Sequence, residues 1–266
     1  HGSLFELLRG RDTFEGLELQ QLLENFRMCD VLTKVSQAIY SDAYVCASVA
    51  VAKRRLALRP RAHRAQASPF VEACLDPDFP LVVVVVEGQQ ATTVNEQEAQ
   101  NVAAIAVALR EGLEGVRDDQ QFWREQLFVV SPHHKQIHAI RRELVAARSW
   151  QPSSSVFVDT VDKMQGQEAD AVIVSYAVSD PELAAMEADF LYGRNRLNVA
   201  ITRARCKSIV FLPKPLLDAS VEVLEVPKAR EGLEFMRALV YRARQGEQLH
   251  FDFPDGSQAS LYRLGS

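Results

Sequence analysis

Five short runs of apolar residues occur along the 266-residue chain. Each run is rich in valine, isoleucine or phenylalanine and lacks a regular alternation with polar residues, which is typical of strands buried on both faces of a parallel sheet. The predicted strands are Val82–Val86, Leu127–Ser131, Val156–Thr160, Ala171–Tyr176 and Ser208–Leu212.

Segments with helical periodicity separate these strands. They are Glu96–Glu111, Lys135–Ala147 and Asn195–Ala204. Strands that alternate with helices predict an α/β domain with a mostly parallel sheet and helices on both faces. Ligands of such domains bind at the carboxyl ends of the strands, so the residues that follow each strand are candidate site residues.

The two flanks of this core have a different character. Further helices are expected over Leu17–Phe26, Thr33–Tyr40 and Ala229–Arg244, and the polar end of the chain is expected to be a small hairpin or irregular. We therefore expect a helical lead-in and connector over 1–80, an α/β domain over 81–213 and a helical tail over 214–266. Six lysines and arginines lie within Lys53–Arg64, which either contacts a phosphate backbone or is a solvated connector.

Composition and charge limit the function classes. The formal net charge is −5, with 47% hydrophobic and 24% charged residues, so any nucleic-acid binding must use a local basic patch. The four cysteines lack CxxC spacing, which argues against a zinc site and favours a reducing, cytoplasmic setting, nucleoid-associated if the source is bacterial. The longest apolar run, Leu81–Val86, is too short to span a bilayer, so no membrane partner is expected.

Two segments concentrate residues suited to phosphates and sugars. One is VDTVDKMQGQEADAVIVSYA (158–177), and the other is RNRLNVAITRAR (194–205). In the first, Thr160 and Gln165 offer short donors for phosphate oxygens, and Gly166 permits a tight turn. Glu168 could accept hydrogen bonds from a ribose. Taken alone, such a loop is more often ordinary turn chemistry than a binding site.

Taken together, the two segments resemble motifs V and VI of superfamily 1 helicases, in the Upf1/Dna2-like subgroup B. That subgroup carries TVDxxQGxEAD followed by RLNVAxTRAR. LFVVSPHHKQIHAIRREL (127–144) is similar to its motif IV, ENFRM (24–28) resembles its QYRM element, and SLF (3–5) resembles the SLFxxL piece before it. The resemblance covers residues 3–213 and is weakest over 53–80.

The resemblance implies a RecA-like domain of the P-loop-NTPase type, namely the C-terminal one of two. The sequence contains no GxxxxGK[ST] phosphate loop and no DExx pair after a strand. By the resemblance, those elements belong to a first RecA-like domain, which would bind most of the ATP and Mg²⁺. This chain alone is therefore expected to be inactive.

The resemblance also assigns roles to individual residues. Arg27 and Arg203 are the implied arginine fingers, which reach the γ-phosphate across the cleft between the two domains. Phe26 replaces the family's tyrosine and is expected to stack on adenine, with Gly166 and Glu168 also at the nucleotide. The expected contacts to nucleic acid are Thr160, Gln165, Ser131 and His133.

Several of these residues also have plainer interpretations. Arg205 is expected to be a structural ion-pair partner, and Asp159 or Asp162 could orient an arginine or cap the loop. His133, His134 and His138 have a spacing close to that of metal ligands, but no cysteine or carboxylate is near, so no metal is predicted. Glu96 and Glu98 fit the acidic first turn of a helix that begins after Asn95.

Three functions follow from these observations. The first is the motor half of a helicase on single-stranded nucleic acid, with a preference for DNA over RNA, and the subgroup resemblance implies movement 5′ to 3′. The second is a non-catalytic RecA-like module that binds nucleic acid or protein. The third is a different P-loop-type ATPase whose halves lie on separate chains. The combination of Arg27, Glu168 and Arg203 favours the first, because a scaffold needs none of them.

Overall fold

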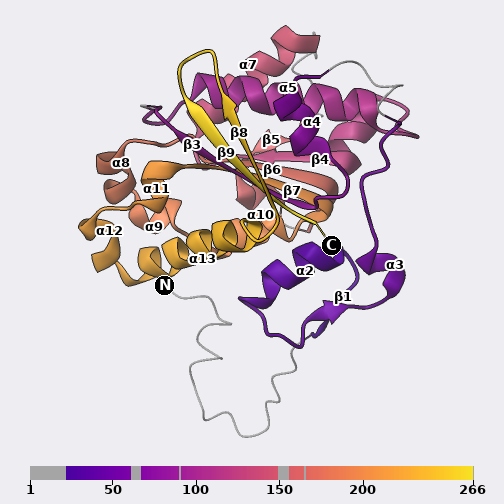
Figure 1. The fold of residues 1–266 in the computed structure, drawn as a ribbon, viewed down its shortest axis with the longest axis horizontal. Helices are drawn as coiled ribbons and strands as arrows, with labels where there is room; N and C mark the ends of the chain where they lie inside the picture. Colours follow the sequence, from indigo (N-terminus) through magenta and orange to yellow (C-terminus); the bar gives the residue numbers. More distant parts are fainter. Residues whose placement is uncertain (1–21, 61–66, 90, 149–155, 165, 266) are drawn as a thin grey trace, which may run out of the picture.

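The computed structural model describes residues 22–60, 67–89, 91–148, 156–164 and 166–265. These residues form a seven-stranded sheet in the order β5-β4-β6-β7-β3-β9-β8 (Figure 1). Its strands are β3 Leu81–Glu87, β4 Leu127–Val130, β5 Val158–Asp159, β6 Ala169–Ser175, β7 Ala204–Pro213, β8 Glu247–Asp252 and β9 Gln258–Leu264. The strands from β5 to β3 are parallel, while β9 and β8 are antiparallel. The predicted mostly parallel α/β sheet is confirmed.

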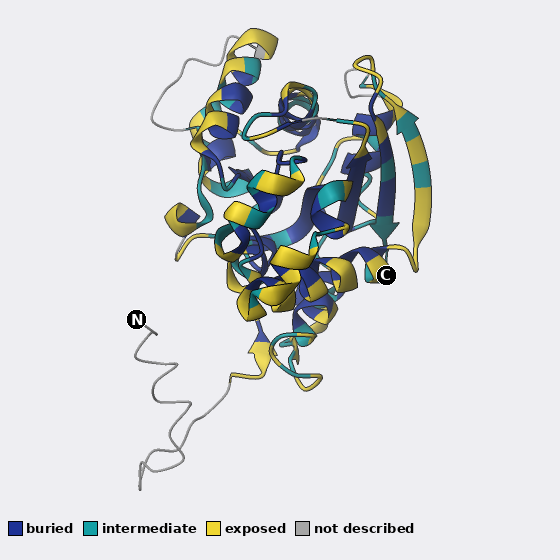
Figure 2. Cartoon of the chain, turned by 90° about the vertical axis from the view of Figure 1, so that its left-hand side faces the viewer, coloured by how far each residue is buried: buried dark blue, intermediate teal, exposed yellow. Residues whose placement is uncertain are grey.

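Helices cover both faces of this sheet. On one face lie α4 Pro69–Leu75, α5 Glu96–Gly112 and α7 His134–Arg148 (Figure 1). On the other lie α2 Asp30–Gln37, α8 Pro181–Met186, α9 Ala188–Leu191, α10 Arg194–Ile201, α11 Lys214–Leu217, α12 Val221–Glu225 and α13 Pro227–Ala243. Figure 2 shows the buried strands between these two layers.

The unbroken apolar strands exist because each face of the sheet has its own core. In β3, Leu81, Val83 and Val85 belong to the core under α13, whereas Val82, Val84 and Val86 belong to the core under α5. Successive side chains of a strand point to opposite faces, so both sets must be apolar. Burying each such side chain contributes roughly 1.5–3 kcal/mol.

Residues 17–21 of the helix predicted over Leu17–Phe26 lie outside the described part of the chain. For residues 22–26, which the structure describes, the prediction is wrong. Glu24–Asn25 instead forms the short strand β1, which pairs in parallel with β2 Val45–Cys46. Asn25 explains the difference. Its side-chain oxygen accepts the backbone N–H groups of Arg27 and Met28 at 2.9 and 3.0 Å, and this local turn competes with a helix.

Three of the element boundaries that differ from prediction lie near the predicted site residues. Helix α2 begins three residues earlier than expected, with Asp30 in its first turn, where a carboxylate is favourable. Helix α10 ends at Ile201 rather than at Ala204. Strand β7 begins at Ala204, four residues before the predicted start, because Ala204 pairs with Ala169 of β6. The last two changes place Arg203 in a turn between helix and strand.

The C-terminal hairpin is confirmed, and it has a role that the sequence did not indicate. Strands β8 and β9 form an antiparallel pair, and β9 also pairs along the whole of β3. The hairpin formed by β8 and β9 therefore extends the central sheet. Strand β8 forms its mostly exposed edge, seen at the right of Figure 2.

Shorter elements complete the described fold. They are the helices α3 Val49–Ala52 and α6 Asp119–Gln121, the π-helix Phe122–Gln126 and the 3-10 helix Val161–Met164. None of the described helices is long and apolar enough to cross a membrane.

Candidate functional site

The predicted site residues come together in two places. Arg27, Glu168 and Arg203 meet beside α2, at the start of β6 and β7. Ser131 and Thr160 line a cavity at the opposite, carboxyl ends of β4 and β5. Gln165 lies outside the described residues.

Arg27 is held in place by contacts from distant parts of the chain. Its Nε donates to Glu168 Oε2 at 2.6 Å, and its terminal nitrogen donates to the Thr202 carbonyl at 3.0 Å. These partners lie 141 and 175 positions away along the chain. A guanidinium group fixed by two such bonds is pre-organised to present its remaining donors.

Arg54 fixes the backbone that carries Arg27. Its guanidinium donates to the carbonyls of Phe26 and Arg27 at 3.0 and 2.7 Å. Arg54 belongs to the basic stretch Lys53–Arg64, for which we expected either phosphate contacts or a solvated connector. Arg54 uses one terminal nitrogen on both carbonyls, a positioning role that neither expectation included. Residues 61–64 of the stretch lie outside the described residues.

Glu168 is the carboxylate of this cluster. Its second oxygen lies 3.5 Å from an Arg205 nitrogen, so it faces two guanidinium groups. The hydrogen bond from Arg27, assisted by the charges of Arg27 and Arg205, lowers the pKa of Glu168 below its usual value despite partial burial. Glu168 is therefore ionised at neutral pH and orients Arg27. Its side chain remains 41% exposed, which leaves room for a ligand hydroxyl.

Arg203 follows α10 in a short turn. Its backbone carbonyl accepts the N–H of Ala169 at 3.0 Å, which ties it to the residue after Glu168. Its Nε is buried and, among the described residues, has no hydrogen-bond partner. Burial and the adjacent charge of Arg27 both lower the pKa of Arg203. A buried donor without an acceptor is costly, by about 1–3 kcal/mol, so this group is suited to an anionic ligand.

Arg205 is a structural residue, as the sequence predicted. Its Nε donates to Asp170 at 2.7 Å, and a terminal nitrogen donates to the Glu125 carbonyl at 2.8 Å. Burial raises the pKa of Asp170, and the neighbouring Arg205 opposes that shift. We call Arg27, Arg54, Arg203 and Arg205 the arginine cluster. Its four guanidinium groups face Glu168 and Asp170, with Glu125 near Arg205 as a third carboxylate, and the excess positive charge favours an anion.

Two more predicted residues border the cluster. Phe26 is 68% exposed, an unusual state for a large aromatic side chain beside a charged cluster. Gly166 has φ of 79°, in the left-handed region that favours glycine, which confirms the tight turn expected there. Their contacts with a nucleotide stay predictions.

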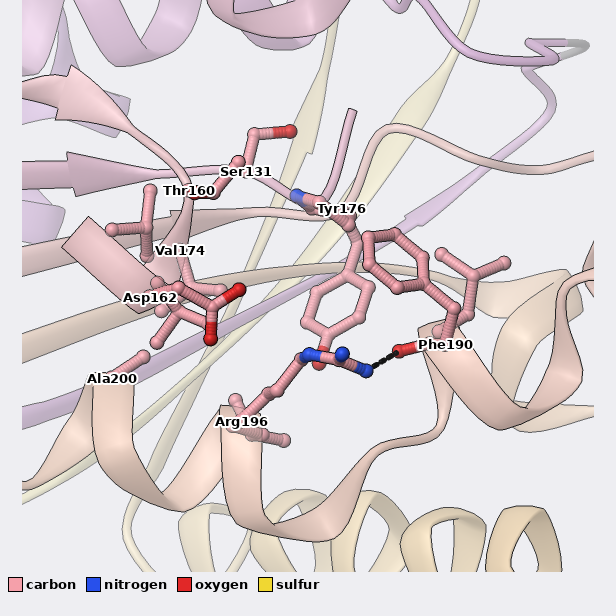
Figure 3. A pocket seen from close by; sticks show the side chains of 13 residues that line it. Ser131, Thr160, Asp162, Val174, Tyr176, Phe190, Arg196 and Ala200 are labelled. Carbon is pink, nitrogen blue, oxygen red and sulfur yellow. Dashed lines mark hydrogen bonds between the residues drawn. The ribbon is translucent and has the colours of Figure 1, made fainter. Parts of the chain in front are cut away.

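The second place is a small, partly open cavity, which we call the strand-end cavity (Figure 3). Ser131 and Thr160 follow β4 and β5 and contribute hydroxyls to its wall. Ser131 is buried, and its oxygen accepts the N–H of His133 at 3.4 Å. Thr160 is half-buried, and its N–H donates to Asp159 Oδ1 at 2.7 Å. Asp159 thus caps the loop.

His133 does not join the strand-end cavity. It lines a neighbouring hollow, where its Nε2 lies 3.5 Å from Glu187 Oε2. Burial lowers the pKa of His133, and the charge of Glu187 acts in the opposite direction. Within the described residues, no group of three or more histidine, cysteine or acidic side chains is arranged to hold a metal ion.

Helix α10 connects the two places. Arg196, Leu197 and Ala200 of α10 line the strand-end cavity, and Arg203 follows its C-terminal end. One short helix therefore contributes to the cavity wall and leads directly into the turn that carries Arg203. This arrangement provides a direct physical connection between the two places.

Sequence reasoning missed a buried polar network behind the cavity. The Asn95 side chain caps α5, as predicted, by accepting the N–H of Glu98 at 2.9 Å. Glu98 is fully buried, and its Oε1 accepts hydrogen bonds from Ser175 Oγ at 2.6 Å and from Ala177 N at 3.1 Å. Ala177 has φ of 62°, an uncommon conformation for alanine. Glu98 therefore holds the strained residue that follows Tyr176 in the cavity wall.

Glu98 should make stability depend on pH. Burial raises the pKa of Glu98 from 4.5 to about 7, against the effect of its two hydrogen bonds. The folded protein then retains a proton that the unfolded chain releases, so this contribution is complete below pH 4.5 and is lost as pH rises through 7. The loss should be on the order of 3 kcal/mol.

Urea unfolding of the wild type and Glu98→Gln between pH 4.5 and 8 measures this effect. The difference in unfolding free energy between the two proteins should change across the window, because glutamine does not titrate. Glu96→Gln is the control, because Glu96 lies in the same helical turn but its side chain is 55% exposed. The unfolding free energy of this variant should depend on pH as that of the wild type does. Parallel pH curves for the wild type and Glu98→Gln would disprove the assignment.

The comparison with known families decides what kind of protein this is. The sequence model of the AAA domain family matches residues 1–212. The chain belongs to this family. Together with the curated relatives, this match identifies a helicase domain of superfamily 1, in the Upf1/Dna2-like subgroup B. The confirmed sheet is thus that of a RecA-like domain in the P-loop NTPase superfamily.

The curated relatives include helicases named for DNA and for RNA. The DNA replication ATP-dependent helicase/nuclease JHS1 of Arabidopsis thaliana is 27% identical over 71% of this chain and 13% of its own length. The DNA replication ATP-dependent helicase/nuclease dna2 of Schizosaccharomyces pombe is 25% identical over 86% of this chain and 16% of its own. The probable RNA helicase armi of Drosophila melanogaster is 29% identical over 44% of this chain and 9% of its own. The helicase domain thus spans less than a fifth of each of these relatives.

Proposed function

We propose that this helicase domain is the C-terminal RecA-like motor domain of an ATP-dependent helicase that moves 5′ to 3′ on single-stranded nucleic acid. The observation that carries the proposal is the buried, unpartnered Nε of Arg203 beside the fixed guanidinium of Arg27. Two adjacent guanidinium groups repel each other, and an anion between them would relieve that repulsion. Arginine fingers on a transferring phosphoryl group have this character.

In this proposal each residue around Arg27, Glu168 and Arg203 has a defined role. ATP with Mg²⁺, bound mainly by a first RecA-like domain, supplies the γ-phosphoryl group. Arg203 and Arg27 donate hydrogen bonds to its oxygens as charge develops, and Glu168 keeps Arg27 in position. The exposed ring of Phe26 stacks on adenine, and the turn at Gly166 lets the backbone approach the nucleotide.

The strand-end residues would bind the nucleic acid. The hydroxyls of Thr160 and Ser131 suit backbone phosphates, with Gln165 and His133 as further contacts. JHS1 and dna2 are named as DNA replication enzymes, which supports DNA over RNA for this domain as well. We also propose a cytoplasmic setting, in agreement with the four free cysteines.

An ATPase assay tests the proposal directly. The complete helicase protein should hydrolyse ATP in the presence of single-stranded nucleic acid, and comparing DNA with RNA oligonucleotides identifies the preferred strand. The 266-residue chain alone should not turn over ATP, because its sequence has no phosphate loop. Robust ATP turnover by the chain alone would contradict the proposal, as would a complete protein that never responds to nucleic acid.

A further inference from the structure

The corner of the molecule formed by α8, α9 and α12 carries exposed apolar side chains (left of Figure 1). Met186 of α8 is 83% exposed, and Val221 of α12 is 66% exposed. Leu224 is also exposed and lies three positions after Val221, so the two share one face of α12, which packs against α8. Single exposed apolar side chains are ordinary, but neighbouring ones mark interaction sites. We call residues 181–190 and 218–226 the α8–α12 surface.

A hollow beside Met186 gives the α8–α12 surface depth. Its walls come from the loop that follows β4, from α8 and α9, and from Val226 at the end of α12. Its apolar lining residues are Pro132, Ala185, Met186, Ala188, Phe190 and Val226. An apolar side chain of a partner protein can therefore enter it. The arginine cluster lies at the other ends of the strands, so the α8–α12 surface is separate from it.

The charge of the α8–α12 surface is entirely negative. Its charged side chains are Glu182, Glu187, Asp189, Asp218, Glu222 and Glu225. Asp218 pairs with Lys214, and within the described part of the chain no lysine or arginine pairs with the other five. Glu187 lies 3.5 Å from His133, but burial lowers the pKa of this histidine, so its ring is neutral at pH 7. The carboxylate charge is therefore largely uncompensated.

This charge decides between the possible occupants. A nucleic-acid strand carries a negative charge on every phosphate, and the carboxylates would repel it. A second copy of this chain, related by a two-fold axis, would place the same acidic residues opposite each other. A protein segment that supplies apolar side chains together with lysines or arginines complements both properties of the surface.

We propose that the α8–α12 surface docks an amphipathic, basic helix of a partner protein. The apolar side of that helix packs against Met186, Val221 and Leu224, as in other complexes in which a helix occupies an apolar groove. Its lysines and arginines face the carboxylates of α8 and α12. This inference goes beyond the proposed function, because it assigns a partner to residues that have no role in ATP hydrolysis or strand binding.

Binding of a model peptide tests the inference. The probe is a fluorescein-labelled helix of about 14 residues, or about four turns, with leucines on one side and lysines on the other. It is titrated with the 266-residue chain and should bind more weakly as salt increases. A scrambled peptide of the same composition lacks an apolar side, and a leucine–glutamate peptide has the wrong charge. Both should bind much more weakly than the probe.

Two variants of the α8–α12 surface should reduce binding of the probe. Met186→Gln retains the length of the side chain but removes its apolar end, and it should weaken binding about 10-fold or more, as expected for one buried methionine. Glu222→Lys combined with Glu225→Lys should weaken binding by a similar factor, because it places like charges opposite each other. All three replaced side chains are exposed, so these variants should fold as the wild type does.

Matched variants on the other face of the sheet are the controls. Val145→Gln changes an apolar side chain of α7 that is exposed to the same extent as Leu224, and Glu114→Lys reverses an exposed carboxylate after α5. Both should bind the probe like the wild type. Probe binding that neither variant of the α8–α12 surface reduces would overturn the inference, as would equal affinity for the leucine–glutamate peptide.

ATP hydrolysis separates this inference from the proposed function. In the complete helicase, Met186→Gln should hydrolyse ATP in the presence of single-stranded DNA at the wild-type rate. Loss of this hydrolysis in Met186→Gln would place the α8–α12 surface in the path of the strand, which overturns the partner site and leaves the proposed function standing. A wild-type protein that binds the probe but never responds to nucleic acid would overturn the proposed function alone.

Discussion

Replacing Arg203 by alanine is expected to lower ATP hydrolysis by the complete helicase by about 10³–10⁵-fold, the range for an arginine finger. ATP binding should change little, because the first RecA-like domain is proposed to hold most of the nucleotide. The physical reason is that the buried Nε of Arg203 has no acceptor among the described residues. It therefore gains its full hydrogen-bond energy only when charge develops on the phosphoryl group. Steady-state hydrolysis with single-stranded DNA and equilibrium binding of a nucleotide analogue measure the two effects separately.

Two further variants make this test specific. Arg203→Lys retains the charge but loses the planar fork, so it should recover only a small part of the lost rate. Arg194→Ala, an exposed arginine at the start of the same helix, should hydrolyse ATP normally. Normal hydrolysis by Arg203→Ala would mean that the residue is not a finger.

The central sheet could be predicted because its signal is local. Each buried strand is an apolar run of a few residues, and five such runs between helical segments are enough to indicate an α/β domain. The hairpin β8–β9 was also expected, but its pairing with β3 was not. Antiparallel pairing between residues so far apart along the chain leaves no local pattern in either segment.

The candidate site could likewise be predicted only as far as local sequence patterns reach. The resemblance to helicase motifs pointed to Arg27, Glu168 and Arg203, yet the contacts that position them come from residues without an indicative pattern. Arg54 lies in a stretch that resembled a solvated connector, and it binds the carbonyls beside Arg27. Asn25 organises the turn before Arg27 from within a segment whose periodicity suggested a helix. These roles depend on where the chain folds back on itself.

Gly232→Ala is expected to destabilise the domain strongly, although alanine is intrinsically about 1 kcal/mol better than glycine inside a helix. Gly232 lies in α13, where a Cβ atom would stand 1.5 Å from the carbonyl oxygen of Tyr192 and 2.5 Å from its carbonyl carbon. These are backbone atoms, so no side-chain rotation can relieve the overlap. Inserting a methyl group into a packed core typically costs 1–3 kcal/mol, and here we expect about 3 kcal/mol or more.

The location of this clash connects α11 and α13 to the arginine cluster. Tyr192 is buried just before α10, and its hydroxyl donates to the Leu216 carbonyl at 2.9 Å. Displacing it would move the start of the helix that Arg203 follows. Urea unfolding of Gly232→Ala measures the loss, with Glu234→Ala on the exposed side of α13 as the control for helix propensity. A rise in the unfolding midpoint of Gly232→Ala would show that propensity outweighs the contact and that α13 does not pack this closely against Tyr192.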